Sequence, residues 1–278
     1  MANKIYYYND NFFKNIDSEE KAYFLGLLYA DGYINDIGYN CYVELTLQTE
    51  DEYILKKFLS SLESNRKIKI IKKKKYQYSR IIINSKKIVN DLKNMGCTNK
   101  KTHTLIFPTK INDKYVHHLI RGFFDGDGCI WRVNNTNTFH MQFTGNVDFL
   151  NGIENFLIKN LNVDKKKHYS PCNKNRKDNI RALKYGGNQI VSKIFELLYD
   201  NSTIYLNRKY FKFLDAKNNI KEKNHIVSYN GIIYDSYNKS KLIDIIQNTT
   251  NLNRDMISSR LIKGWTVEKI LNNNLILE

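Results

Sequence analysis

The chain has little of what marks fibrous, disordered, membrane or secreted proteins. Two prolines and 13 glycines in 278 residues exclude collagen-like and low-complexity chains. The longest strongly apolar run, near residues 23–30, is too short to span a bilayer. The N-terminus, MANKIYYYND, lacks the apolar segment of a signal peptide, so we expect an intracellular, non-secreted protein.

Paired cysteines are also missing. Cys41, Cys97, Cys129 and Cys172 are scattered and form no Cys-x-x-Cys pair. This spacing argues against a zinc site or a disulfide framework, and it predicts reduced thiols. The six histidines show no ligand spacing, and we expect His117 and His118 to cap or precede a helix. No phosphate-binding or dinucleotide-binding glycine motif occurs.

Positive charge is plentiful, and it is unevenly distributed. The net charge is +16, of which residues 1–221 carry +15 and residues 222–278 carry +1. Basic residues recur in RKIKIIKKKKYQYSR (66–80), DKKKHY (164–169) and NKNRKDNIRALKY (173–185). Such an excess indicates a polyanionic partner.

The sequence contains an internal repeat whose copies begin with similar apolar stretches, YFLGLLYADGYI (23–34) and HLIRGFFDGDGCI (118–130). In the first copy we expect a helix, a strand in which Val43, Leu45 and Leu47 alternate with polar residues, a helix over 51–63, strands over 67–75 and 78–85, and a helix with Gly96 just past its end. In the second copy we expect a helix from His118, a strand over 138–146, a helix over 147–161, strands at 167–172 and 179–187, and a helix over 188–199.

We interpret each copy as αββαββα, with the first helix leading into a strand pair, which predicts an α+β fold rather than a parallel α/β sheet. We expect half-domains at 1–105 and 106–220. The remaining 221–278 reads as a hairpin around Asn230-Gly231 followed by helices over 239–248 and 254–264, a helix-turn-helix pattern. Within it, Trp265 is expected in the core, and Arg260 is a candidate DNA contact.

An aspartate stands at the end of each leading helix, Asp31 in one copy and Asp127 in the other. The negative end of the helix dipole disfavours a carboxylate there. We expect Gly32 to adopt the left-handed conformation that stops a helix. Ala30 lies four residues after Gly26, and Gly126 lies four after Gly122.

Small residues at this spacing let two helices approach closely, and parallel packing would bring the two aspartates together. Two neighbouring carboxylates repel, so they would take up a proton or bind a cation such as Mg²⁺. Under a basic surface, such a pair suits metal-assisted cleavage of a phosphodiester. A single Asp-Gly would be read as a turn, but its repetition favours a catalytic site.

The stretches FLGLLYADG (24–32) and IRGFFDGDG (120–128) resemble the two signature helices of LAGLIDADG homing endonucleases. The resemblance covers residues 18–215 and extends to LTLQTED and to the segment that leads into the second signature. It implies a monomer with a pseudo-twofold, saddle-shaped fold and Mg²⁺-dependent, staggered cleavage of double-stranded DNA at a long site. It also implies a location in the cytoplasm of a bacterial or phage-infected cell, or in an organelle matrix.

The resemblance assigns roles by position. It implies Asp31 and Asp127 as metal ligands, aided by the carbonyls of Ala30 and Gly126. It places Gln48 near the cleavage water, with Thr144 as a loose counterpart, and it sends Lys101 and Lys209 to the scissile phosphate. Lys100 and Arg208 are adjacent enough to be confused with them. Tyr29 departs from the pattern by replacing the earlier aspartate, which Asp125 keeps, whereas Arg121 within the second signature is tolerated by related members of the family.

Two other functions fit the same residues. An RNA maturase would bind the chain's own intron RNA, and a regulator would bind DNA without cutting it. Both carboxylates are retained, which favours the nuclease over the regulator. The tail resembles helix-turn-helix repeats attached to nucleases, which would lengthen the recognised site, although its near-neutral charge leaves a protein-interaction or stability role open.

Overall fold

The computed structural model describes residues 6–38, 40–99, 101–169, 179–219, 226–229, 232–235 and 239–273, with only the backbone described at 102–103, 226–229, 232–235 and 239–241. Contacts divide the chain into a main unit, Met1–Asn219, and a C-terminal unit, Ile220–Glu278. Among the described residues, no helix combines the length and apolarity needed to cross a membrane.

The first half of the main unit follows the predicted order of elements. These are α1 (Glu19–Asp31), β1 (Gly32–Asn35), β2 (Tyr42–Gln48), the 3-10 turn η1 (Thr49–Asp51), α2 (Glu52–Ser61), β3 (Lys69–Lys73), β4 (Tyr76–Ile83) and α3 (Lys86–Asn94). The antiparallel sheet has the order β1-β2-β4-β3. Val43, Leu45 and Leu47 of β2 are buried as the alternation predicts, and Gly96 takes a positive φ just past α3.

The second half repeats this order after a short helix, α4 (Lys101–Thr104). Its elements are α5 (Asp113–Asp127), β5 (Gly128–Arg132), β6 (Phe139–Asn146), α6 (Val147–Leu161), β7 (Ile180–Gly186), α7 (Asn188–Tyr199) and α8 (Asn207–Asn218). Its antiparallel sheet has the order β5-β6-β7. The strand expected at 167–172 is represented by one bridge, Tyr169 to Ala182, and the rest of it lies outside the described residues.

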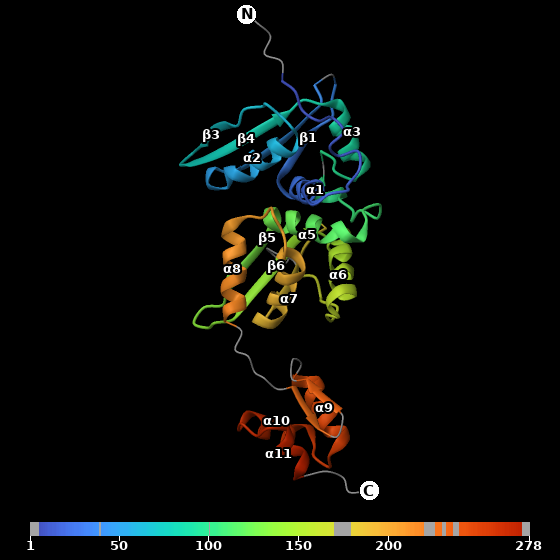
Figure 1. The fold of residues 1–278 in the computed structure, drawn as a ribbon, viewed down its shortest axis with the longest axis vertical. Helices are drawn as coiled ribbons and strands as arrows, with labels where there is room; N and C mark the ends of the chain where they lie inside the picture. Colours follow the sequence, from blue (N-terminus) through green and yellow to red (C-terminus); the bar gives the residue numbers. More distant parts are fainter. Residues whose placement is uncertain are drawn as a thin grey trace, which may run out of the picture. The chain divides into compact units, whose positions relative to one another are not determined.

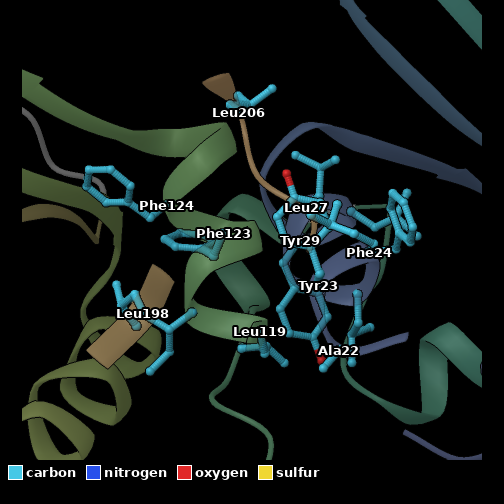
Figure 2. Close-up of a cluster of buried hydrophobic side chains, with 14 of the residues drawn as sticks. Ala22, Tyr23, Phe24, Leu27, Tyr29, Leu119, Phe123, Phe124, Leu198 and Leu206 are labelled. Atoms are coloured by element: carbon cyan, nitrogen blue, oxygen red, sulfur yellow. The ribbon is translucent and has the colours of Figure 1, made fainter. Parts of the chain in front are cut away.

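The main unit is thus α+β, as predicted, with α1 and α5 side by side between the two sheets (Figure 1). One apolar core runs through both halves. Figure 2 shows part of it, with Tyr23 and Phe24 from α1 and with Leu119, Phe123 and Phe124 from α5. Both leading helices have side-chain caps, from Ser18 to Lys21 N and from Asn112 to Lys114 N.

The helix α5 begins five residues earlier than the sequence suggested, so His117 and His118 lie inside it rather than before it. It begins there because Asn112 caps it, accepting from Lys114 N through its side chain. Within the helix, the fully buried Arg121 donates to Leu198 O, Ile204 O and Glu19 Oε1 and contacts His118 Nδ1 at 2.8 Å. Burial, then the charge of Arg121, lowers the pKa of His118 to about 3. A neutral His118 therefore accepts from Arg121 through Nδ1.

Arg121 is the first target for a stability test. We expect Arg121→Leu to lower the free energy of unfolding by about 3–5 kcal/mol, because it removes the charged partner of Glu19 and the side-chain donor of two carbonyls. Lys159→Gln breaks an exposed ion pair with Asp113 and should cost about 0.5 kcal/mol or less. Urea unfolding measures both. Equal, small losses would show that the Arg121 network adds no net stability.

The C-terminal unit contains a hairpin, β8 (Ile226–Tyr229) with β9 (Ile232–Asp235), and α9 (Lys239–Thr249), α10 (Arg254–Ile262) and α11 (Val267–Asn272). The hairpin and the first two helices are where the sequence predicted them. Its own small core includes Ile246, Ile257 and Ile270. Trp265 packs partly buried against this core, with the Arg260 guanidinium 4.9 Å and the Lys269 ammonium 4.5 Å from its ring centre.

Candidate active site

Two glycines bring the leading helices into contact. A Cβ atom on Gly26 would lie 2.0 Å from Leu119 O, and one on Gly122 would lie 2.0 Å from Tyr23 O. Residue numbers rise together along both helices at these contacts, so α1 and α5 are parallel. The two carboxylate-bearing ends therefore meet at one end of the pair, as the glycine spacing predicted.

At that end, Gly126 lies against Ala30 and Asp31. A Cβ on Gly126 would be 2.2 Å from Ala30 Cβ and 3.0 Å from Asp31 Oδ2, so only glycine leaves room for this approach. Asp31 and Asp127 are the last residues of their helices, and both side chains are exposed to solvent. The structure thus brings together the four residues predicted to surround a metal.

Both helices pass directly into strands, which corrects one expectation. Gly32 has φ −71° and ψ 149°, and Gly128 has φ −89° and ψ 160°, so neither is left-handed. Glycine is required here for space, because a Cβ would lie 2.6 Å from Leu28 O at Gly32 and 2.4 Å from Phe124 O at Gly128. The helix and the strand are joined without a loop.

Two lysines occupy equivalent places at the helix ends. Lys101 Nζ donates to Leu28 O at 2.9 Å and to Ala30 O at 2.5 Å. Lys209 Nζ, from α8, lies 2.5 Å from Phe124 O and 3.5 Å from Gly126 O, positions that correspond to 28 and 30 in the repeat. It also donates to Asp125 O at 2.6 Å and to Gly128 O at 2.7 Å.

These ammonium groups offset the unfavourable interaction of Asp31 and Asp127 with the negative ends of their helix dipoles. Each places a positive charge at a helix C-terminus, where the dipole favours a cation. Lys209 is 4% exposed, and burial lowers its pKa to about 8 despite the opposing charge of Asp125. Burial lowers the pKa of Lys101 as well. The contacts of both lysines are to carbonyls of the helix ends, and their predicted reach to the scissile phosphate stays a prediction.

The two aspartates differ electrostatically. Desolvation by the surrounding protein, then the charge of Asp31, raises the pKa of Asp127 to about 6. Desolvation also raises the pKa of Asp31, against the charges of Lys101, Lys209 and Arg208. Solvent reaches both side chains and moderates these shifts. The charge of Asp31 acts on Asp127, which is consistent with two neighbouring carboxylates that can share a cation or a proton.

This coupling predicts a pH-dependent gain of stability in Asp127→Asn. A raised folded-state pKa contributes stability that is present at low pH and lost as the pH rises through about 6. At pH 7.5 the variant should therefore melt about 2–3 °C above the wild type, and the difference should vanish near pH 4. Asp113→Asn, at an exposed ion pair, is the control. A difference in Tm that does not change with pH would contradict the coupling.

The residues two positions before Asp31 and Asp127 differ between the halves, being Tyr29 in the first and Asp125 in the second. The fully buried Asp125 accepts from Tyr23 OH at 2.9 Å, Tyr199 OH at 2.7 Å and Leu206 N at 2.8 Å. Its counterpart Tyr29 is also buried and instead donates to Met95 O. Asp125 is thus a structural carboxylate that joins α5 to α1, α7 and the segment before α8.

Gln48 is exposed at the end of β2. The strand registers identify its counterpart, because Gly32 pairs with Leu45 and Gly128 pairs with Phe143. Gln48 is three residues after Leu45, and Asn146 is three residues after Phe143, so Asn146 is the counterpart of Gln48. Thr144, the loose match from sequence, corresponds to Thr46 instead. Asn146 is buried, caps α6 and donates to Leu105 O at 2.7 Å, so it does not present its amide as Gln48 does.

Among the described residues, no cluster of three or more His, Cys, Asp or Glu forms a ready-made metal site. The donors at the helix ends are two carboxylates and nearby carbonyl oxygens, of which Ala30 O and Gly126 O already face lysines. Oxygen donors with few protein ligands suit Mg²⁺, which keeps water and phosphate oxygens in its coordination sphere. The carboxylates fit such an ion.

No protein-family model matches the chain, and no curated protein matches it in sequence. Solved structures do match. The LAGLIDADG meganuclease I-CpaMI bound to uncleaved DNA aligns with TM-score 0.50 and 14% identity, over 83% of this chain and 98% of that one. The homing endonuclease I-WcaI bound to its DNA recognition sequence gives 0.49 and 13%, over 73% and 90%. I-SmaMI bound to an uncleaved DNA target in the presence of calcium ions gives 0.44 and 11%, over 72% and 90%.

Proposed function

We propose that this chain, which has the fold of the LAGLIDADG homing endonucleases, is a site-specific DNA endonuclease that makes a staggered double-strand break. The observation that carries the proposal is the meeting of Asp31 and Asp127 at the shared end of two parallel helices, with Gly126 opening the space between them. Both signature helices lie in one chain, so a single copy supplies both acids.

Asp31 and Asp127 would hold a divalent ion, which we propose is Mg²⁺ and which would activate water and neutralise the leaving oxygen. The chain's own residues prepare this end of the helices. The charges of Lys101 and Lys209 oppose the rise in the pKa of both Asp31 and Asp127, which favours the ionised carboxylates that a metal needs. Gln48 is proposed to orient the water, since it is exposed at the end of β2.

DNA is the proposed partner. The solvated strand β3 carries exposed Lys69, Lys72 and Lys73, and its neighbour β4 carries Tyr76 and Gln77. Basic side chains neutralise phosphates, and polar side chains on strands can read base edges in the major groove. The sequences of β3 and β4 therefore suit a DNA-facing sheet surface.

The C-terminal unit is proposed to lengthen the DNA site through α10. Asn253 caps this helix, and Lys263 is exposed at its end. A footprint of the full chain should extend past the main site on one side. Arg260→Gln with Lys263→Gln should shorten that side only, whereas an unchanged footprint would assign the unit another role.

Digestion of the source organism's intact and intron-free DNA, with magnesium and with calcium, tests the main proposal. We expect one recurrent, staggered, magnesium-dependent cut when every new end is sequenced. Tight duplex binding without new ends would indicate a regulator. Binding to a structured intron RNA without duplex binding would indicate a maturase.

A further inference from the structure

An ion pair connects the two halves beside the candidate site. Arg208, in the first turn of α8, donates from Nε to Asp51 Oδ2 at 3.1 Å. Asp51 is 4% exposed, while the Arg208 side chain is 47% exposed. The carboxylate is thus fixed in the protein, and the guanidinium it holds reaches solvent.

The backbone around Arg208 is held by the first half as well. Tyr53 OH accepts from Asn207 N at 2.6 Å and donates to Tyr205 O at 3.1 Å. Lys57 Nζ donates to Thr203 O at 2.5 Å. These contacts from α2 hold the backbone that leads into α8. Arg208 is therefore positioned both by this backbone and by the bond of its side chain to Asp51.

The ion pair lies at the same end of the first-half sheet as Asp31, because Asp31 directly precedes β1, Gly32 of β1 pairs with Leu45 of β2, and Asp51 closely follows β2. Asp51 follows Gln48 by three residues, so it lies at the end of the first-half sheet. The charges of both partners, Arg208 and Asp51, act on Asp31.

The second half cannot build the same pair. The strand registers that match Gln48 with Asn146 match Asp51 with Phe149. Phe149 is a fully buried aromatic residue that packs on Phe123 and Phe107. A carboxylate is therefore present at this position in one half only.

We propose that Asp51 is a positioning residue that holds Arg208 beside Asp31, and that Arg208 binds the phosphate cut on one DNA strand only. The inference rests on the proposed endonuclease function. Arginine suits this role, because its terminal nitrogens remain able to donate to a phosphate while Nε is bound to the carboxylate. The two strands are then cut by chemically unequal sites.

Single-turnover cleavage of a target duplex labelled separately on each strand tests this. Arg208→Gln should slow one strand by about 10²-fold and the other by no more than about twofold, since the lost charge is local to one phosphate. Asp51→Ala should slow the same strand by about tenfold, because Arg208 loses its anchor. Arg208→Lys should restore part of that strand's rate.

Lys217→Gln is the matched control, because Lys217 lies in the same helix, is 43% exposed and pairs with Glu196. It should leave both strand rates unchanged. Equal slowing of both strands by Arg208→Gln, together with a lower Tm, would show that the pair only docks the two halves and would overturn the inference. Wild-type protein that cuts no duplex would overturn the endonuclease proposal itself, and this inference with it.

Discussion

Asp31→Asn and Asp127→Asn are each expected to bind the target duplex as tightly as the wild type and to cut it on the order of 10³-fold more slowly or worse. Asparagine keeps the size of the side chain, so the packing of Gly126 against residue 31 survives. It removes the charge that a metal needs. Binding is preserved because phosphate contacts come from basic residues elsewhere, and losing a negative charge does not weaken them.

Calcium gives this prediction a readout that does not depend on cleavage. Calcium should raise the Tm of the wild type by relieving the repulsion between Asp31 and Asp127, and it should raise neither variant's Tm to the same extent. Asp36→Asn, which removes a surface partner of Lys93, serves as the control for both assays. Full-rate cleavage by either variant would refute the assignment of the site.

Gly122→Ala is expected to destabilise the main unit by about 3 kcal/mol or more, the upper range for overpacking a rigid contact. The added methyl group would meet the Tyr23 carbonyl, which belongs to a helix and cannot rotate away. Gly26→Ala should do the same through Leu119. The two helices would have to separate, which would also separate Asp31 from Asp127. We therefore expect cleavage to fall even at temperatures where the variant remains folded.

Gly38→Ala is the appropriate comparison, because a Cβ there meets nothing within 4 Å and only the positive φ of 67° opposes it. Its cost should be about 1 kcal/mol. Chemical unfolding and cleavage rates of the three variants test whether stability and activity depend on the close approach of α1 and α5. A stable, active Gly122→Ala would mean that α1 and α5 do not depend on this close approach.

The sequence was informative where a pattern repeats. Glycines four residues before Ala30 and Gly126 predicted the parallel helix pair, and alternation in β2 predicted its buried face. Fold features that depend on distant partners were not visible. The burial of Arg121 depends on the carbonyls of Leu198 and Ile204, which lie far away in the chain.

Within the site, local reasoning failed for similar reasons. Gly32 was assigned a left-handed turn because glycine often ends helices that way, but here the limiting factor is space against Leu28 O. Thr144 was chosen by motif distance, whereas strand pairing selects Asn146. Asp51 was missed altogether, because nothing in LTLQTED indicates that a residue 157 positions later will pair with it.

The loop-free passage from α1 to β1, and from α5 to β5, has a mechanical consequence. With no hinge between them, each acid and the first side chains of its strand form one rigid body. Under the proposed function, a duplex that fits the sheet poorly could not be accommodated by moving the sheet alone, because the carboxylate would move with it. A base mismatch at β1 or β5 would then change the distance between the carboxylate and the phosphate.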